Sequence, residues 1–214
     1  MKLKLSYQTQ HLPAPYAFSA VFDVELDKTL NIAFMLTYLD REELSEEEIL
    51  SEGYSLEDDF SWHGTLGTHW KDPIKVLLTT ARSKEPQDSF FLHIANEGAE
   101  WFPAVADDVL VHELLQAVLE AAEREAPLSI YFTDSKQEHI HLVWKFAERQ
   151  TYLDSRAVSW DGAQEVMKLV YALDFETMKP SKERKVNSIS FDGASWYSVQ
   201  SPQLWTTLGA LLQG

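Results

Sequence analysis

The stretch Ile189–Tyr197, which reads Ile-Ser-Phe-Asp-Gly-Ala-Ser-Trp-Tyr, decides how the rest of the chain is interpreted. It predicts a β-hairpin, because apolar residues flank an Asp-Gly pair and Gly adopts the positive φ of a tight turn without steric cost. A near copy, Ile-Ala-Asn-Glu-Gly-Ala-Glu-Trp-Phe, occupies residues 94–102. An amphipathic helical pattern follows each copy, so the pair indicates a repeated structural unit.

The elements around the two copies have the same predicted order: strand, strand, strand, helix, hairpin, helix. Alternating apolar residues indicate the strands, and apolar residues three and four positions apart indicate the helices. In the first half we expect strands over 2–8, 17–27 and 31–39, a helix capped by Ser45 and Glu48, a hairpin over 90–102 and a helix over 107–124. In the second half we expect strands over 128–133, 139–147 and 152–160, a helix over 164–173, the hairpin, and a terminal helix with Leu204, Leu208, Leu211 and Leu212 directed inward.

This order predicts an α+β fold, in which antiparallel β meanders and hairpins have helices packed on one face, with a tandem pseudo-repeat (βββ-α-ββ-α twice). The expected domains are an acidic half over 1–126, with an inserted segment over 54–88, and a compact half over 127–214. Two alternatives stay open. The halves share little identity outside the hairpins, so their common order can be coincidental, and they can form one continuous domain.

The composition is typical of a soluble globular protein, with 45% hydrophobic, 24% charged and 12% aromatic residues. The chain has no cysteine, which excludes disulfides, thiolate metal sites and cysteine nucleophiles. The first residues lack the apolar core of a signal peptide, and no apolar run reaches membrane-spanning length. We therefore expect a cytoplasmic protein.

Acidic charge is concentrated in the first half. Residues 1–126 contain 9 Lys and Arg against 24 Asp and Glu (−15), and residues 127–214 contain 9 against 10 (−1), which together give the net charge of −16. Ten of the acids lie between Asp40 and Asp59, with Arg41 as the single cation. This charge argues against nucleic acid and membrane surfaces as partners and favours a basic protein partner, bound by residues such as Glu46 and Glu47. The alternative is an acidic face that only water covers.

The segment Trp62–Trp70 reads Trp-His-Gly-Thr-Leu-Gly-Thr-His-Trp and is nearly palindromic. Its glycines allow a tight loop that brings His63 and His69 together. Trp62 and Trp70 would then form the walls of a binding pocket for a ring-shaped or cationic small ligand. The alternative is a loop that the two Trp side chains fix to the core.

His139 and His141 are two residues apart on a predicted strand, which places both imidazoles on one face. This spacing occurs in metal sites, but two ligands are fewer than the three or four that zinc needs. The polar face of an amphipathic strand explains the same pattern. If His63 and His69 met this pair in space, the four imidazoles would form a site for zinc or another divalent metal.

The sequence contains no P-loop, no Gly-X-Gly-X-X-Gly after a strand and no Gly-X-Ser-X-Gly elbow. We therefore expect a binding or protein-interaction protein without catalytic activity or cofactor, with residues 40–59 and 62–70 as its contact surfaces. The alternative is a metal-dependent hydrolase or small-molecule enzyme that uses His63, His69, His139 and His141. A third hypothesis is a homo-oligomer, in which the basic cluster Lys179–Lys185 contacts the acidic helix of another copy.

Overall fold

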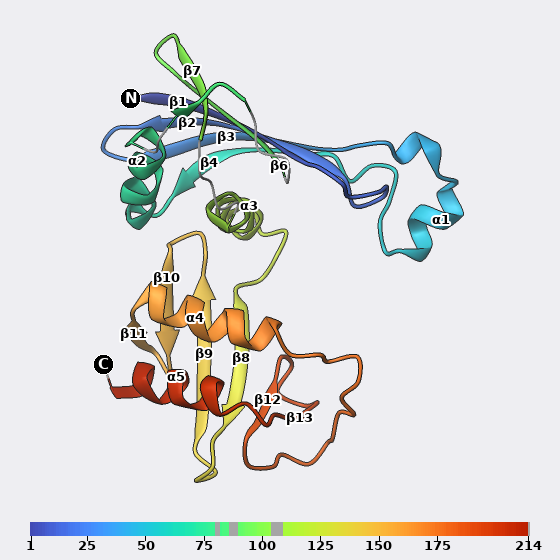
Figure 1. The fold of residues 1–214 in the computed structure, drawn as a ribbon, viewed down its shortest axis with the longest axis vertical. Coiled ribbons are helices and arrows are strands. Elements are labelled where there is room, and N and C mark those ends of the chain that lie inside the picture. Colours follow the sequence, from blue (N-terminus) through green and yellow to red (C-terminus); the bar gives the residue numbers. More distant parts are fainter. Residues whose placement is uncertain (80–81, 86–89, 104–108, 214) are drawn as a thin grey trace. The chain divides into compact units, whose positions relative to one another are not determined.

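The computed structural model describes residues 1–79, 82–85, 90–103 and 109–213. Contacts divide the chain into two compact units, Met1–Glu125 (unit 1) and Ala126–Gly214 (unit 2). Each unit is built on one antiparallel sheet with helices against its buried face (Figure 1). The predicted α+β fold with antiparallel meanders and hairpins is confirmed.

Unit 1 contains a seven-stranded sheet with the strand order β4-β3-β2-β1-β6-β7-β5. Its strands are β1 (Lys2–Thr9), β2 (Phe18–Leu26), β3 (Leu30–Tyr38), β4 (Phe60–Leu66), β5 (Arg82–Ser83), β6 (Phe90–Asn96) and β7 (Ala99–Pro103). Its helices are the 3₁₀ helices η1 (Arg41–Glu43) and η2 (Thr68–Trp70), and the α-helices α1 (Glu46–Ser51), α2 (Lys71–Thr79) and α3 (Val109–Ala121). The three predicted strands of the first meander are therefore present as β1, β2 and β3.

The core of unit 1 follows from the alternation of apolar and polar residues along these strands. One face of β1, β2 and β3 is buried and consists of Leu3, Leu5, Tyr7, Ala20, Phe22, Val24, Leu30, Ile32, Phe34 and Leu36. The helices add the buried side chains of Ile74 and Leu77 from α2, and of Val111, Leu114, Ala117 and Val118 from α3. Figure 1 shows α2 and α3 on the same side of this sheet.

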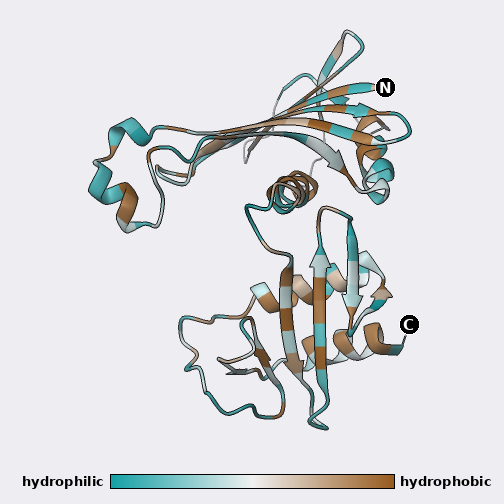
Figure 2. Ribbon diagram, turned by 180° about the vertical axis from the view of Figure 1, so that it is seen from behind, coloured by the Kyte–Doolittle hydropathy of each residue, from teal (hydrophilic) through white to brown (hydrophobic). Residues whose placement is uncertain are grey.

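Unit 2 contains a six-stranded sheet with the strand order β11-β10-β9-β8-β12-β13. Its elements are β8 (Leu128–Thr133), β9 (His139–Lys145), β10 (Gln150–Leu153), β11 (Arg156–Val158), α4 (Trp160–Tyr171), β12 (Ser188–Ser190), β13 (Tyr197–Ser198) and α5 (Pro202–Gln213). The alternation of hydrophobic and more polar residues is visible as brown and pale bands along β8 and as brown and teal bands along β9 (Figure 2). Leu204, Leu208 and Leu211 of α5 are buried as expected, whereas Leu212 is half-buried.

Both meanders have four strands, one more than the sequence analysis predicted. In unit 1 the fourth strand is β4, which lies in the segment 54–88 together with α2. In unit 2 the predicted strand over 152–160 is a hairpin of β10 and β11, because Asp154 and Ser155 both adopt positive φ and reverse the chain. Residues 80–81 and 86–88 of the segment 54–88 lie outside the described residues.

The two hairpins that define the predicted repeat differ in their turns. In the first, Asn96 pairs with Ala99, and Glu97 and Gly98 form a two-residue turn with φ of 48° and 86°. In the second, the last pair is Ile189 with Tyr197, so the connection is a longer loop and the predicted tight turn is wrong. The Asp192 carboxylate accepts hydrogen bonds from the Ala194 and Ser195 amides, which holds these groups away from a strand ladder.

The strand orders of the two sheets correspond: each places its first strand between the other three strands of the meander and a hairpin. In both units a helix precedes this hairpin (α2 and α4), and another follows it (α3 and α5). The tandem pseudo-repeat stays a prediction. On this element order, α1 is the α-helix of unit 1 that has no counterpart in unit 2, whereas β4 and α2 correspond to β11 and α4.

Candidate functional site

The Trp-His segment that we expected to form a loop is mostly regular structure. In β4 the side chains of Trp62 and Leu66 lie on the inner face, and those of Ser61, His63 and Thr65 lie exposed on the outer face. The Trp62 ring lies over Gly64, where an added Cβ would come within 2.2 Å of it. Trp70, in η2, is fully buried at 0% exposure, so it cannot form the wall of a pocket open to solvent.

The four histidines of the predicted metal site are divided between the units. His63 and His69 are exposed in unit 1, and His139 and His141 lie on the outer face of β9 in unit 2. The His141 ring stacks on Tyr131, with 4.2 Å between the ring centroids, and bonds the Ser129 hydroxyl. Within the described part of each unit, no three His, Asp or Glu side chains are arranged to hold a metal ion. A site that combines residues of both units stays a prediction.

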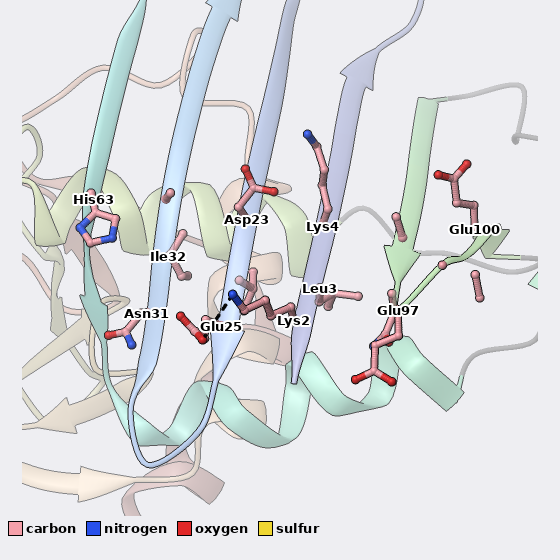
Figure 3. Close-up of a pocket in the computed structure, with 16 residues that line it drawn as sticks. Lys2, Leu3, Lys4, Asp23, Glu25, Asn31, Ile32, His63, Glu97 and Glu100 are labelled. Atoms are coloured by element: carbon pink, nitrogen blue, oxygen red, sulfur yellow. Dashed lines mark ion pairs between the residues drawn. The ribbon is translucent and has the colours of Figure 1, made fainter.

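The outer face of the unit 1 sheet contains a hollow of about 370 Å³ (Figure 3). Its polar lining comes from neighbouring strands: Lys2 and Lys4 from β1, Asp23 and Glu25 from β2, Asn31 from β3, His63 from β4, and Asn96, Glu97 and Glu100 from the β6–β7 hairpin. Lys2 and Glu25 are direct neighbours across the strands and form an ion pair at 3.8 Å. This pair is 81% and 55% exposed, so water screens it.

The hollow carries charges of both signs that lie close enough to compensate one another. It contains one imidazole, and the residues that line it include no Ser, Thr or Tyr that could act as a nucleophile beside it. This arrangement can hold water and small polar groups.

A second candidate surface is the segment 40–59 between β3 and β4, which we call the acidic arm. Figure 1 shows α1 beyond one end of the sheet, with α2 near the opposite end. The arm is fixed by Arg41, whose guanidinium donates to Asp58 Oδ2 at 3.0 Å and to the carbonyl oxygens of Ser55 and Pro15. The same guanidinium lies 3.6 Å from the centroid of the Tyr38 ring. The single cation of the arm is therefore buried and neutralised inside it.

Hydrogen bonds determine the charge state of the carboxylates that build the arm. Burial raises the pKa of Asp58, but bonds from the Ser55 amide and hydroxyl and from Arg41 outweigh burial and leave the pKa below its usual value. In the predicted capping box, the Ser45 side chain and amide hydrogen-bond Glu48 and lower its pKa. Both groups are thus held in the anionic form that these bonds require.

The outward side of the arm combines acidic and apolar side chains. Glu46 and Glu47 are exposed in the first turn of α1, as expected. Leu50 of α1 and Leu56 of the turn after it are 56% and 59% exposed, whereas Ile49, next to Leu50 in the chain, is fully buried. Neither leucine was predicted to be exposed, because the helical pattern alone does not show whether Ile49 or Leu50 of the short α1 faces the core, and Leu56 lies in a turn after the helix. The sequence analysis also missed the role of Arg41, for which the only signal was one cation among ten acids.

Comparisons with known proteins give no relative: no protein-family model, no curated protein and no solved structure matches the chain. Among the described residues, no helix has both the length and the apolar composition needed to cross a membrane.

Proposed function

We propose that this chain is a binding protein whose acidic arm contacts a basic, amphipathic segment of a protein partner. The observation that carries the proposal is the exposure of Leu50 and Leu56 among carboxylates, on an arm that the buried Arg41 holds in place. Exposed leucines bordered by carboxylates fit a partner with apolar and cationic side chains on one face.

Charge supports this choice of partner. The arm has ten acids, and its only cation already contacts Asp58, so it leaves an uncompensated negative surface. Such a surface steers a cationic partner towards it and increases the association rate at low salt. Apolar contact with Leu50 and Leu56 then contributes binding that salt does not screen.

The ordered structure of the acidic arm also supports the proposal. The Ser45 capping box fixes the start of α1, and the Arg41 network fixes the segment that follows. Less conformational entropy is lost on binding when the contact surface is already ordered.

The test is titration of the whole protein with a basic amphipathic peptide in which Leu recurs every three to four residues and Lys fills the other positions. We expect binding that weakens as salt rises, that falls about tenfold in Glu46→Gln/Glu47→Gln, and that also falls in Leu50→Ser/Leu56→Ser. Glu176→Gln/Glu183→Gln is the matched control, because it removes the same charge from exposed residues of unit 2. Equal loss of binding in the control would show that only net charge matters and would contradict the proposal.

A further inference from the structure

One edge of β4 is free in the described part of the chain. β4 is a terminal strand of the unit 1 sheet and pairs only with β3 among the described residues. Its pairing runs without interruption from Leu30–Leu66 to Leu36–Phe60, so no bulge bends the edge away. The other terminal strands, β5, β11 and β13, have only two or three residues, whereas β4 has seven.

The residues of β4 lack the features that protect an edge strand from pairing. Proteins usually place Lys, Pro or a bulge on such strands, because unpaired N–H and C=O groups attract another strand. From Phe60 to Leu66 there is no Pro and no charged residue. The net charge of −16 opposes self-association in general, but this edge contributes nothing to that repulsion.

The sequence of β4 is complementary to itself in one antiparallel register. When two copies pair around His63, all seven residues find a partner: Phe60 faces Leu66, Ser61 faces Thr65, and Trp62 faces Gly64. The inner face then joins apolar with apolar residues, and the outer face joins hydroxyl with hydroxyl. At the Trp62–Gly64 positions, the Trp62 ring of each copy already covers Gly64 of the same copy, so this pair adds no side-chain contact between the copies.

We infer that β4 binds β4 of a second copy of this chain, which joins two unit 1 sheets into one continuous sheet across a two-fold axis at His63. The contact is isologous, so it closes after two copies and leaves no further β4 edge. It uses a surface separate from the outward side of the acidic arm, and the inference stands independently of the proposed function.

A charge placed at His63 tests both the contact and its register. On the proposed axis His63 faces itself, so His63→Lys and His63→Glu each place like charges opposite one another, while a mixture of the two places opposite charges there. Ala33→Lys is the matched control, because Ala33 is exposed on the same face, pairs with His63 from the neighbouring strand β3, and so lies one strand inside the edge.

Sedimentation equilibrium of the full chain, from low to high micromolar concentration, measures the dimer. We expect the wild type and Ala33→Lys to dimerise, each His63 variant to dimerise about fivefold or more weakly, and native mass spectrometry of the mixture to show the heterodimer in excess of the statistical ratio. A wild type that remains monomeric at about 24.5 kDa overturns the inference. A dimer that His63→Lys does not weaken, or a statistical mixture, overturns it equally.

Discussion

The contact between Arg41 and Asp58 is expected to hold the acidic arm on unit 1, and its removal allows a quantitative test. The guanidinium Nη1 lies 3.0 Å from Asp58 Oδ2, and the two side chains are 9% and 27% exposed. The perturbation is Arg41→Met, which keeps an unbranched apolar side chain over the Tyr38 ring but removes the donors to Asp58, Ser55 and Pro15.

The stability lost in Arg41→Met depends on how deeply the Arg41–Asp58 ion pair is buried. Loss of one partner of a fully buried ion pair costs about 3–5 kcal/mol, because the other charge stays desolvated. Asp58 is partly exposed and keeps its bonds from Ser55. Arg41 Nη2 is buried without a hydrogen-bond partner among the described residues, and this desolvation already offsets part of the stability that the ion pair contributes. We therefore expect a loss of about 2 kcal/mol in the stability of the arm, a roughly 30-fold change in its opening equilibrium.

Hydrogen exchange of peptides that cover residues 40–59 measures this opening directly, while peptides of unit 2 serve as an internal reference. The cycle of Arg41→Met, Asp58→Asn and the double variant isolates the pairwise term, for which we expect about 1–2 kcal/mol. The same cycle for the exposed pair Lys2–Glu25 should give at most a few tenths of a kcal/mol. If both cycles gave the same coupling, the claim that the Arg41 network fixes the arm would be wrong.

Three further predictions concern other groups. The pKa of Asp58 is lowered in the folded chain. The stability that the Asp58 carboxylate contributes to the arm is therefore complete above the ordinary carboxyl pKa of about 3.9, and it is lost as the pH falls through the pKa of the folded state. Hydrogen exchange in the arm, corrected for the intrinsic rate, should rise below about pH 4 in the wild type and change less in Asp58→Asn. Gly64→Ala forces the Trp62 ring to move and should destabilise unit 1 by about 1–3 kcal/mol in urea unfolding. When Gly64→Ala is added to the Trp62→Ala variant, it should lower the free energy of unfolding much less, because the ring is already absent. Hydrogen bonds from the Ser195 and Ala194 amides lower the pKa of Asp192, so Asp192→Ala should accelerate exchange at these two amides and leave the β6–β7 hairpin unchanged.

The strands of both sheets could largely be predicted from the sequence because each has one buried face. Apolar and polar residues alternate through β1, β2 and β9, and the period of two leaves only one assignment. The start of α1 could be predicted for an equally local reason, since Ser45 and Glu48 bond each other's backbone amides. Where one short stretch determines the geometry, the sequence is sufficient.

β4 could not be predicted because its local signals disagree with its tertiary environment. Gly64 and Gly67 are typical of a loop, whereas pairing with β3 and the Trp62 ring above Gly64 stabilise an extended strand. That error also produced the expected Trp62–Trp70 pocket, since in a strand Trp62 and His63 must lie on opposite faces. The arm was predicted as an acidic surface from composition, but the burial of Arg41 depends on Pro15 and Asp58, which are distant from it in sequence.

The two contacts that we propose for unit 1 should respond to added salt in opposite ways, because they depend on charge in opposite ways. The acidic arm attracts a cationic partner, so added salt screens that attraction and weakens binding. The β4 edge carries no charge, yet each copy carries a net charge of −16, so added salt screens the repulsion between copies and strengthens the dimer. One salt series on the wild type, followed by peptide titration and by sedimentation, should therefore show two opposite slopes. Parallel slopes would mean that at least one of the two contacts does not depend on charge as proposed, and the two proposals could not both stand.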